Sequence, residues 1–246
     1  MKKLPNHVAI IMDGNTRWAE NKNLDKNDGH KEGVKKARLA VEFFLENKIK
    51  NLTLFAFSTE NWGRQKKEVK ALLKLFLEAI NEQTPDLIKN KVKLNFIGDI
   101  SRFDKVLINK IKSSQIKTSK YDSKMSLNIA ISYGGRWDIE QALKSIVKDI
   151  LKRKIKAKNI DESLITDYLS TSLIPDPDLI IRSAGEQRMS NFFLWQAAYS
   201  EIYFLKKLWP DFNEGDFEKA LDEYALRKRK FGCLLYTSPS PRDRYI

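Results

Sequence analysis

The chain has 246 residues, of which 42% are hydrophobic and 31% charged, so it can bury a sizeable core in a single domain. With only 10 Gly and 7 Pro against 13 Phe, 8 Tyr and 5 Trp, it is not a collagen-like, low-complexity or wholly disordered chain. Its 45 Lys and Arg outnumber 32 Asp and Glu, and the net charge of +13 indicates an anionic partner: nucleic acid, anionic lipid or a phosphorylated small molecule.

Hydropathy and cysteine content indicate a cytoplasmic protein. No apolar run approaches the roughly 18 residues that a membrane span needs, and the stretch after Met1-Lys2-Lys3 is too short for a signal peptide. The lone cysteine, Cys233, leaves no intramolecular disulfide and no Cys-based zinc site.

Short apolar runs alternate with longer segments of helical spacing along the chain. We expect strands at 8–12, 52–57, 92–97, 127–131 and 179–181, and helices at 31–48, 65–83, 102–117, 136–154, 161–170 and 214–230. Near-continuous apolarity suits strands covered on both faces. The predicted fold is therefore α/β: a single domain with a mostly parallel central sheet flanked by helices.

The end of the chain differs in character from the rest. Residues 233–246 lack helical period and contain two Ser-Pro steps, and they resemble translated sequencing-adaptor read-through. We expect one domain over 1–232 and a non-native or disordered tail over 233–246.

In open parallel sheets, ligands bind beyond the carboxyl ends of the strands. Small residues, arginines and carboxylates follow the expected strands at 13–18, 58–64, 98–99, 133–136 and 182–191. A glycine such as Gly14 lets backbone N–H groups approach an anion, and arginines match phosphate oxygens. Carboxylates among them suggest a bridging Mg²⁺, with Asp13 and Glu201 as candidates.

Each of these residues also has a plainer interpretation. Asp13 is as well placed to cap the next helix, and Gly134-Gly135 fits a simple tight turn better than a ligand site. His7 is better explained as a structural hydrogen-bonding residue. Glu60 and Arg64 could simply pair with each other on a helix. The convergence on one sheet edge outweighs any single residue.

Apolar residues recur with helical period after Arg64, at Val69, Leu72, Leu73, Phe76, Leu77 and Ile80. Such a stripe usually faces the core. Beside phosphate-ready loops it would also suit a pyrophosphate carried on a hydrocarbon, and periodicity does not separate a core from a lipid channel.

Five segments, in order, resemble the cis-prenyltransferases, the undecaprenyl diphosphate synthase family. They are His7 to Ala19, Gly29-His30-Lys31-Glu32-Gly33, Phe55 to Trp62, Tyr133 to Ile139 and Asp178 through Glu201, within a match over about 5–232. The resemblance implies an enzyme that condenses isopentenyl diphosphate onto farnesyl diphosphate with Mg²⁺, giving cis double bonds. It further implies an apolar tunnel between sheet and helices, with Val41, Phe44, Leu72, Phe76 and Ile80 in its wall, and a homodimer.

The resemblance also assigns roles to individual residues. Asp13 matches a catalytic Mg²⁺-binding residue, Glu201 a second metal contact, and Asn61 a position described as a proton acceptor, although a neutral amide is better suited to positioning. The matched substrate-binding residues are Gly14, Asn15, Thr16, Arg17, Trp18, Lys26, His30, Ser58, Thr59, Glu60, Trp62, Arg64, Arg182, Arg188, Met189 and Ser190.

The expected product is undecaprenyl diphosphate, a bacterial cell-wall lipid carrier, with peripheral contact at the inner membrane face for product release. The alternatives are a different product length or, from another class, a basic nucleic-acid-binding module. The arginines lie after strands rather than on one basic face with interleaved aromatics, which argues against nucleic acid. Lys26 and Gln187 depart from the family's usual Arg and His, and Lys230-Phe231-Gly232 runs straight into the unusual tail.

Overall fold

The fold is taken from a computed structural model, which describes residues 3–227. The expectations for the tail at 233–246 and for Lys230-Phe231-Gly232 lie outside the described residues. The strands are β1 (His7–Ile11), β2 (Asn51–Ser58), β3 (Val92–Ile97), β4 (Met125–Tyr133), β5 (Leu179–Arg182) and β6 (Glu201–Phe204). The α-helices are α1 (Asn15–Asn21), α2 (Lys26–Glu46), α3 (Lys66–Lys89), α4 (Lys105–Thr118), α5 (Gly135–Leu151), α6 (Glu162–Tyr168) and α7 (Glu214–Leu226).

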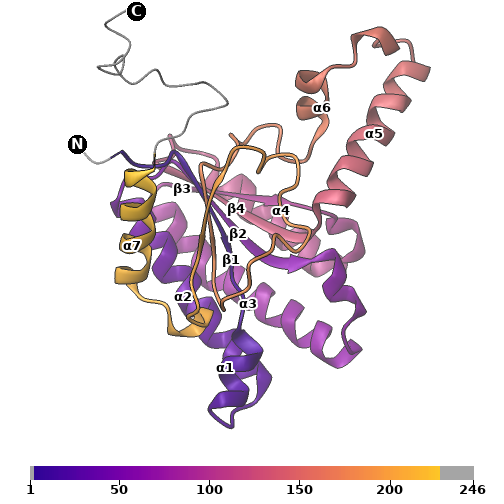
Figure 1. Ribbon diagram of the computed structural model, residues 1–246. Coiled ribbons are helices and arrows are strands. Elements are labelled where there is room, and N and C mark those ends of the chain that lie inside the picture. The colour runs from indigo at the N-terminus through magenta and orange to yellow at the C-terminus, as the bar shows by residue number, and fades with distance from the viewer. Residues whose placement is uncertain (1–2, 228–246) are drawn as a thin grey trace, which may run out of the picture.

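The six strands form one sheet in the order β3-β4-β2-β1-β5-β6, and every pairing between them is parallel. The predicted α/β class and parallel sheet are confirmed. All residues of β1 are buried, as expected for a central strand covered on both faces. Because the strands are parallel, all their carboxyl ends lie along one edge, at the end of the sheet where α1 begins (Figure 1).

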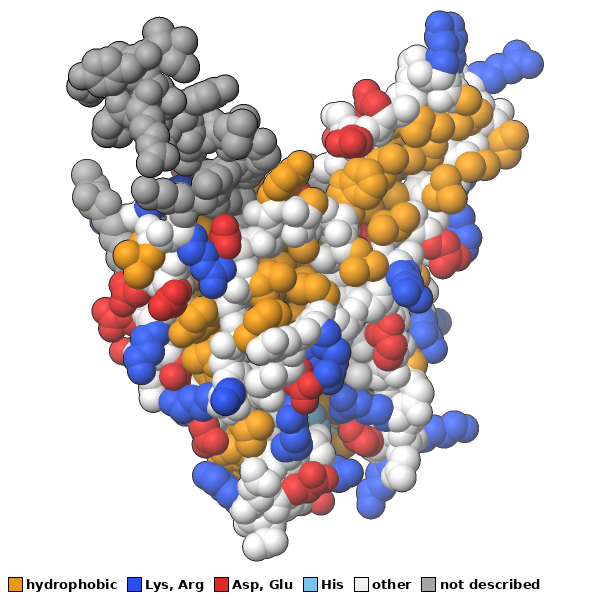
Figure 2. Space-filling model, viewed as in Figure 1, with side chains coloured by type: hydrophobic (Ala, Val, Ile, Leu, Met, Phe, Trp, Pro, Cys, Tyr) orange, Lys and Arg blue, Asp and Glu red, His pale blue; other side chains and the backbone are white. Residues whose placement is uncertain are grey.

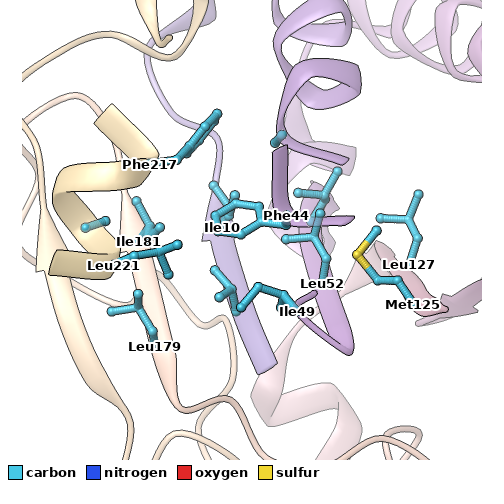
Figure 3. Close-up of a cluster of buried hydrophobic side chains, with 14 of the residues drawn as sticks. Ile10, Phe44, Ile49, Leu52, Met125, Leu127, Leu179, Ile181, Phe217 and Leu221 are labelled. Atoms are coloured by element: carbon cyan, nitrogen blue, oxygen red, sulfur yellow. The ribbon is translucent and has the colours of Figure 1, made fainter. Parts of the chain in front are cut away.

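Two apolar layers cover the two faces of the sheet. On one face Phe44 of α2 and Phe217 of α7 pack at 5.3 Å between ring centroids over the central strands; Figure 3 shows Phe217 and Leu221 directed toward Ile10 and Ile181. On the opposite face Phe192, from the segment between β5 and β6, stacks on Phe55 at 4.5 Å. The long β5–β6 connection thus forms part of the core.

Several elements differ from the sequence prediction, and one of them is α2, which begins at Lys26 rather than at residue 31. β6, with four residues, and α1, with seven, were not predicted. α3 continues past Pro85 to Lys89, whereas we expected it to end at residue 83. Apolar packing outweighs the lost backbone hydrogen bond there, since Leu87 is buried in the core beyond the proline. No helix within residues 3–227 has the length and apolarity needed to cross a membrane.

A polar row crosses the amino half of the sheet. His7 Nε2 lies 2.7 Å from Thr53 Oγ1, Asn128 Nδ2 donates to the same hydroxyl at 3.3 Å, and Asn95 Nδ2 donates to Asn128 Oδ1 at 2.9 Å. His7 Nδ1 also lies 2.6 Å from the Pro175 carbonyl oxygen. His7 is fully buried, and the interpretation of it as a structural hydrogen-bonding residue is confirmed.

Burial lowers the pKa of His7 from 6.5 to about 4, so the folded chain keeps this ring neutral where the unfolded chain protonates it. The free energy of unfolding should therefore fall as pH drops below 6.5, by about 1.4 kcal/mol per unit until pH approaches 4. His7→Gln keeps a donor and an acceptor but cannot take up the proton. Urea unfolding at pH 7.5 and pH 5.0 should show a loss about 2 kcal/mol larger for the wild type than for His7→Gln; equal losses would contradict this role.

Candidate active site

The carboxyl edge of the sheet brings together residues that follow β1, β2 and β5. Asp13 follows β1 and accepts a hydrogen bond at 3.0 Å from Arg182, the last residue of β5. The backbone N–H of Asp13 donates to Ser183 Oγ at 2.7 Å. The N-cap of α1 is Gly14, whose left-handed φ of 100° suits a residue without a side chain. Asp13 is thus an ion-pair partner at the sheet edge rather than a helix cap.

Arg182 is the buried anchor of this cluster, with 3% of its side chain exposed. Besides Asp13, its guanidinium donates to Ser190 Oγ at 2.8 Å and to the Arg188 carbonyl oxygen. Its Nε is buried without a hydrogen-bond partner among the described residues. Because the guanidinium has several donors in a rigid plane, it fixes the segment 188–190 against the end of β1.

Glu186 holds the two remaining arginines of the cluster. Arg17 Nη1 lies 3.1 Å from Glu186 Oε1, and Arg188 Nη1 lies 2.5 Å from Glu186 Oε2. Arg17 Nη2 also lies 3.6 Å from Asp13 Oδ1. Arg17, Arg182 and Arg188, predicted from widely separated segments, therefore lie around two carboxylates. This cationic cradle has the donor geometry for phosphate oxygens.

The segment after β2 forms a short 3₁₀ helix, η1 (Thr59–Gly63), beside the cradle. Its first turn is closed by a capping box in which Asn61 Oδ1 accepts from the Ser58 backbone N–H at 3.0 Å. The Asn61 side chain is thus held by the backbone, in keeping with a positioning role. Trp62 Nε1 donates to Ser132 Oγ at 2.9 Å, which ties η1 to the end of β4.

Glu60 turns toward the β5–β6 connection. Its Oε1 accepts from Asn191 Nδ2 at 2.7 Å, and its Oε2 accepts from Thr59 Oγ1 at 3.1 Å. Partial burial alone would raise the pKa of Glu60, but these hydrogen bonds lower it below its ordinary value. Arg64 pairs with Glu68 at 2.8 Å, so the alternative Glu60–Arg64 pair does not form.

Two buried polar atoms near the cradle have no partner among the described residues: Asn15 Oδ1 and His30 Nε2. Burial, and then the charge of Arg64, lower the pKa of His30. The glycines flanking this region explain the close packing, since a Cβ at Gly29 would lie 2.1 Å from the Asn15 carbonyl oxygen and one at Gly33 2.3 Å from Asn15 Oδ1. Unpaired buried polar atoms are costly, so both are candidates for ligand contacts.

A cavity of about 210 Å³ begins at these two residues and runs between the sheet and helices α2 and α3. Its lining is mainly apolar and includes Met12, Val34, Leu54, Leu73, Leu94 and Ile129. Of the expected wall residues, Val41, Leu72, Phe76 and Ile80 line it. The expectation for Phe44 is wrong, because this ring is fully buried in the core against Phe217.

The remaining predicted substrate contacts lie around the same edge. Trp18 Nε1 donates to Asp211 Oδ1 at 2.6 Å, and Lys26, the first residue of α2, lies 3.9 Å from Glu20. Thr16 is half-buried in α1, and Met189 packs against the Phe192 cluster. The fold brings Gly14, Ser58 and Thr59 to this edge as well, at the ends of β1 and β2.

Glu201 does not join this site. It begins β6, in register with Leu179 and through it with Val8, whereas Asp13 lies five residues beyond Val8. At about 3.3 Å per strand residue, the backbone of Glu201 lies about 10 Å short of the end of β1 at Ile11, beyond which Asp13 follows. Glu201 Oε2 instead accepts from Arg227 Nη1 at 2.9 Å. The expected pairing of Asp13 and Glu201 around one ion is therefore wrong within a single chain.

The fit of the cradle to Mg²⁺ can be judged from its donors. Within residues 3–227 no group of three or more His, Cys, Asp or Glu side chains is placed to hold a metal. Asp13, with 32% of its side chain exposed at the cradle, offers one carboxylate. Mg²⁺ binds through one or two carboxylates together with substrate phosphate oxygens and water, so this donor set fits the ion only alongside a phosphorylated ligand.

Three residues of the site were not singled out from the sequence: Ser183, Glu186 and Asn191. All three lie in the predicted fifth segment, between Arg182 and Glu201. A signal for Ser183 and Glu186 was present, since both are polar residues close to the carboxyl end of β5. Their particular partners depend on the path of the β5–β6 connection, which a local pattern does not specify.

Comparison with known proteins agrees with this geometry. Residues 11–232 match the prenyltransferase family model described as "Putative undecaprenyl diphosphate synthase". The chain is 48% identical over 229 residues to a ditrans,polycis-undecaprenyl-diphosphate synthase ((2E,6E)-farnesyl-diphosphate specific) of Pasteurella multocida, covering 93% of this chain and 95% of that protein. It is 47% identical over 229 residues to the Coxiella burnetii protein of that name, covering 93% and 96%.

Solved structures of diphosphate synthases share the fold. A lavandulyl diphosphate synthase from Lavandula x intermedia, in complex with dimethylallyl diphosphate, superposes with a TM-score of 0.91 at 36% identity over 93% of this chain and 98% of that one. A probable undecaprenyl diphosphate synthase from Campylobacter jejuni superposes with a TM-score of 0.77 at 36% identity, over 94% and 100%.

Proposed function

The chain belongs to the undecaprenyl diphosphate synthase family of prenyltransferases, and we propose that it adds isopentenyl diphosphate units to farnesyl diphosphate to build a long cis-polyprenyl diphosphate. The observation that carries the proposal is the placement of the cavity. The apolar cavity between the sheet and helices α2 and α3 reaches Met12, Asn15 and His30, and Met12 is the neighbour in the chain of Asp13 in the cationic cradle. A substrate with a diphosphate head and a hydrocarbon tail matches both parts.

The cradle binds and orients the two diphosphates. Arg17 and Arg188 supply exposed guanidinium groups, and Arg182 holds the loop that carries Ser190. These charges stabilise the diphosphate that leaves as cationic character develops on the allylic carbon. The isopentenyl double bond attacks that carbon, and proton loss then forms the new double bond.

Asp13 is the residue that would hold Mg²⁺ together with substrate oxygens, and the ion would supply Lewis-acid stabilisation of the leaving diphosphate. Asn61 orients the 3₁₀ helix η1, because its side-chain Oδ1 accepts a hydrogen bond from the Ser58 backbone N–H. His30 and Asn15 line the cavity, and each has one buried side-chain atom without a partner among the described residues. We assign them to contacts with the allylic substrate.

The product is inferred to be undecaprenyl diphosphate, since the relatives at 44–48% identity carry that name. The lavandulyl diphosphate synthase of similar fold carries a different product name, so the fold alone does not fix the product. In a bacterium the product would serve as the cell-wall lipid carrier. Such a long hydrocarbon partitions into lipid, and a net charge of +13 favours contact of a cytoplasmic protein with the anionic inner leaflet.

We infer that the chain forms a homodimer through α5. Ile139, Leu143, Val147 and Leu151 recur every four residues and are 36%, 59%, 46% and 79% exposed. Figure 2 shows hydrophobic side chains gathered on this projecting region, where Figure 1 places α5 and α6. An exposed apolar stripe along one helix face is typical of a protein–protein interface.

Asp13→Ala should abolish turnover, because it removes the carboxylate that we place on the metal; thermal unfolding is measured beside activity, since the variant also leaves the buried Arg182 without this partner. Incorporation of radiolabelled isopentenyl diphosphate, with Glu46→Ala as an exposed control at the end of α2, measures this effect. Near-normal incorporation by Asp13→Ala would refute the role of Asp13. A wild-type chain that forms no polyprenyl product from farnesyl and isopentenyl diphosphates would refute the proposed function itself.

Ala79→Leu should shorten the product. Ala79 lines the cavity, and three added carbon atoms occupy volume that the growing chain needs, while Ala71→Leu alters the same helix at a position outside the lining. Mass spectrometry of the extracted lipids should show loss of about one or two five-carbon units for Ala79→Leu alone. An unchanged length distribution would place the growing chain elsewhere.

Leu143→Glu should convert a dimer to a monomer, because it puts a charge in the middle of the apolar stripe. The control is Val106→Glu on α4, at a position that is 64% exposed away from the stripe. Sedimentation equilibrium gives the mass of each variant. A wild type that sediments as a monomer, or a Leu143→Glu variant that remains dimeric, would argue against this interface.

A further inference from the structure

The segment Tyr133-Gly134-Gly135-Arg136 has no part in the chemistry above. Its backbone is instead held by one residue of the β5–β6 connection, Asn191. Asn191 accepts hydrogen bonds from the backbone N–H of Gly135 at 2.7 Å, through its carbonyl oxygen, and of Arg136 at 3.0 Å, through Oδ1. Its Nδ2 donates to Glu60 Oε1 at 2.7 Å. Asn191 therefore joins the segments that follow β2, β4 and β5.

The backbone is strained at Asn191 and at the residue before it. Ser190 and Asn191 both have left-handed φ values, 48° and 57°. Asparagine tolerates this region better than most residues, but serine does not. Such strain persists where surrounding contacts determine the conformation, and it clusters at functional sites. Here the strained serine is the residue whose hydroxyl accepts from Arg182.

The two glycines provide the space that Asn191 occupies. A Cβ at Gly134 would lie 2.6 Å from Asn191 Nδ2 and 2.6 Å from Thr59 Oγ1, and a Cβ at Gly135 would lie 2.5 Å from the Phe192 carbonyl oxygen. A side chain at either position would push the β5–β6 connection away from η1. The two glycines of the predicted tight turn therefore allow residues 191 and 192 to pack closely against this segment.

We propose that Asn191 is a positioning residue that locks the Arg188–Ser190 loop to Glu60 of η1, and so sets the separation between the two halves of the headgroup site. This inference rests on the proposed function. Both halves carry predicted substrate contacts: Arg182, Arg188 and Ser190 on one side, Glu60 and Asn61 on the other. The Asn191 side chain bridges these halves directly through its bond to Glu60.

The Glu60–Asn191 contact can be tested with charge chemistry that leaves the shape unchanged. Asn191→Asp keeps an oxygen for the Arg136 N–H but places a carboxylate against Glu60. Glu60→Gln removes the charge and keeps an oxygen that can accept from Asn191. In the double variant, the amide introduced at position 60 can donate to the carboxylate introduced at position 191, so the hydrogen bond returns with the donor and acceptor exchanged.

The four chains form a double-mutant cycle, read out as kcat and the KM for isopentenyl diphosphate in the full-length protein. We expect Asn191→Asp to lower kcat/KM about tenfold or more in the wild-type background, mainly through KM, and by less than about threefold in the Glu60→Gln background. Asn191→Gly, which keeps the left-handed backbone and loses the side chain, should resemble Asn191→Asp. Thermal unfolding of each variant separates this effect from loss of the fold.

Two results would overturn the inference. The first is wild-type kinetics for a folded Asn191→Asp variant. The second is an equal kinetic loss from Asn191→Asp with and without Glu60→Gln, even if the two substitutions are coupled in thermal stability. An inactive wild type would instead count against the proposed function, and calorimetric titration with inorganic diphosphate would still test the coupling in that case.

Discussion

The buried ion pair between Arg182 and Asp13 is the contact on which the headgroup site depends. A guanidinium with 3% exposure needs partners for its donors, and here both terminal nitrogens are met, by Asp13, Ser190 and the Arg188 carbonyl, while Nε has no partner among the described residues. Asp13 follows the end of β1, and the other two partners lie in the segment 188–190 of the β5–β6 connection. The pair therefore closes the carboxyl edge by joining the central strand β1 to the β5–β6 connection.

The sheet separates the roles of its two faces. On one face, α2 and α3 leave the cavity between themselves and the strands, while α7 fills the remaining space with Phe217 and Leu221. On the other face, Phe192 and Phe193 stack at 4.1 Å under the segment that carries the arginines and Asn191. Packing on the second face thus positions the charged loop at the carboxyl edge, where Met12, Asn15 and His30 line the cavity of the first face. The amino half carries the polar row of His7, which contributes to stability and lies at the opposite end of the strands from the site.

The sequence predicted the features that depend on local pattern. Parallel order follows from strand and helix alternation, and it alone places Asp13, Glu60 and Arg182 along one edge. Contacts that depend on the exact path of a connection could not be predicted: Glu186 against Arg17, Asn191 against Glu60, and Phe44 in the core rather than the cavity wall. The position of Glu201 could not be predicted either, because it is the first residue of the short strand β6 and so lies at the amino end of the strand, away from the carboxyl edge. The motif match did not show at which end of β6 this residue would lie.

The ion pairs of the cradle differ in how easily a substrate can replace them. Arg188 and Arg17 are 61% and 44% exposed and share Glu186, and exposed pairs contribute only about 0–1 kcal/mol each. A diphosphate can therefore take these two guanidinium groups from Glu186 at little cost. Arg182 cannot be released in the same way, because separation from Asp13 would leave its buried charge unpaired. The cradle accordingly consists of one fixed arginine that holds its shape and two exchangeable arginines that meet the ligand.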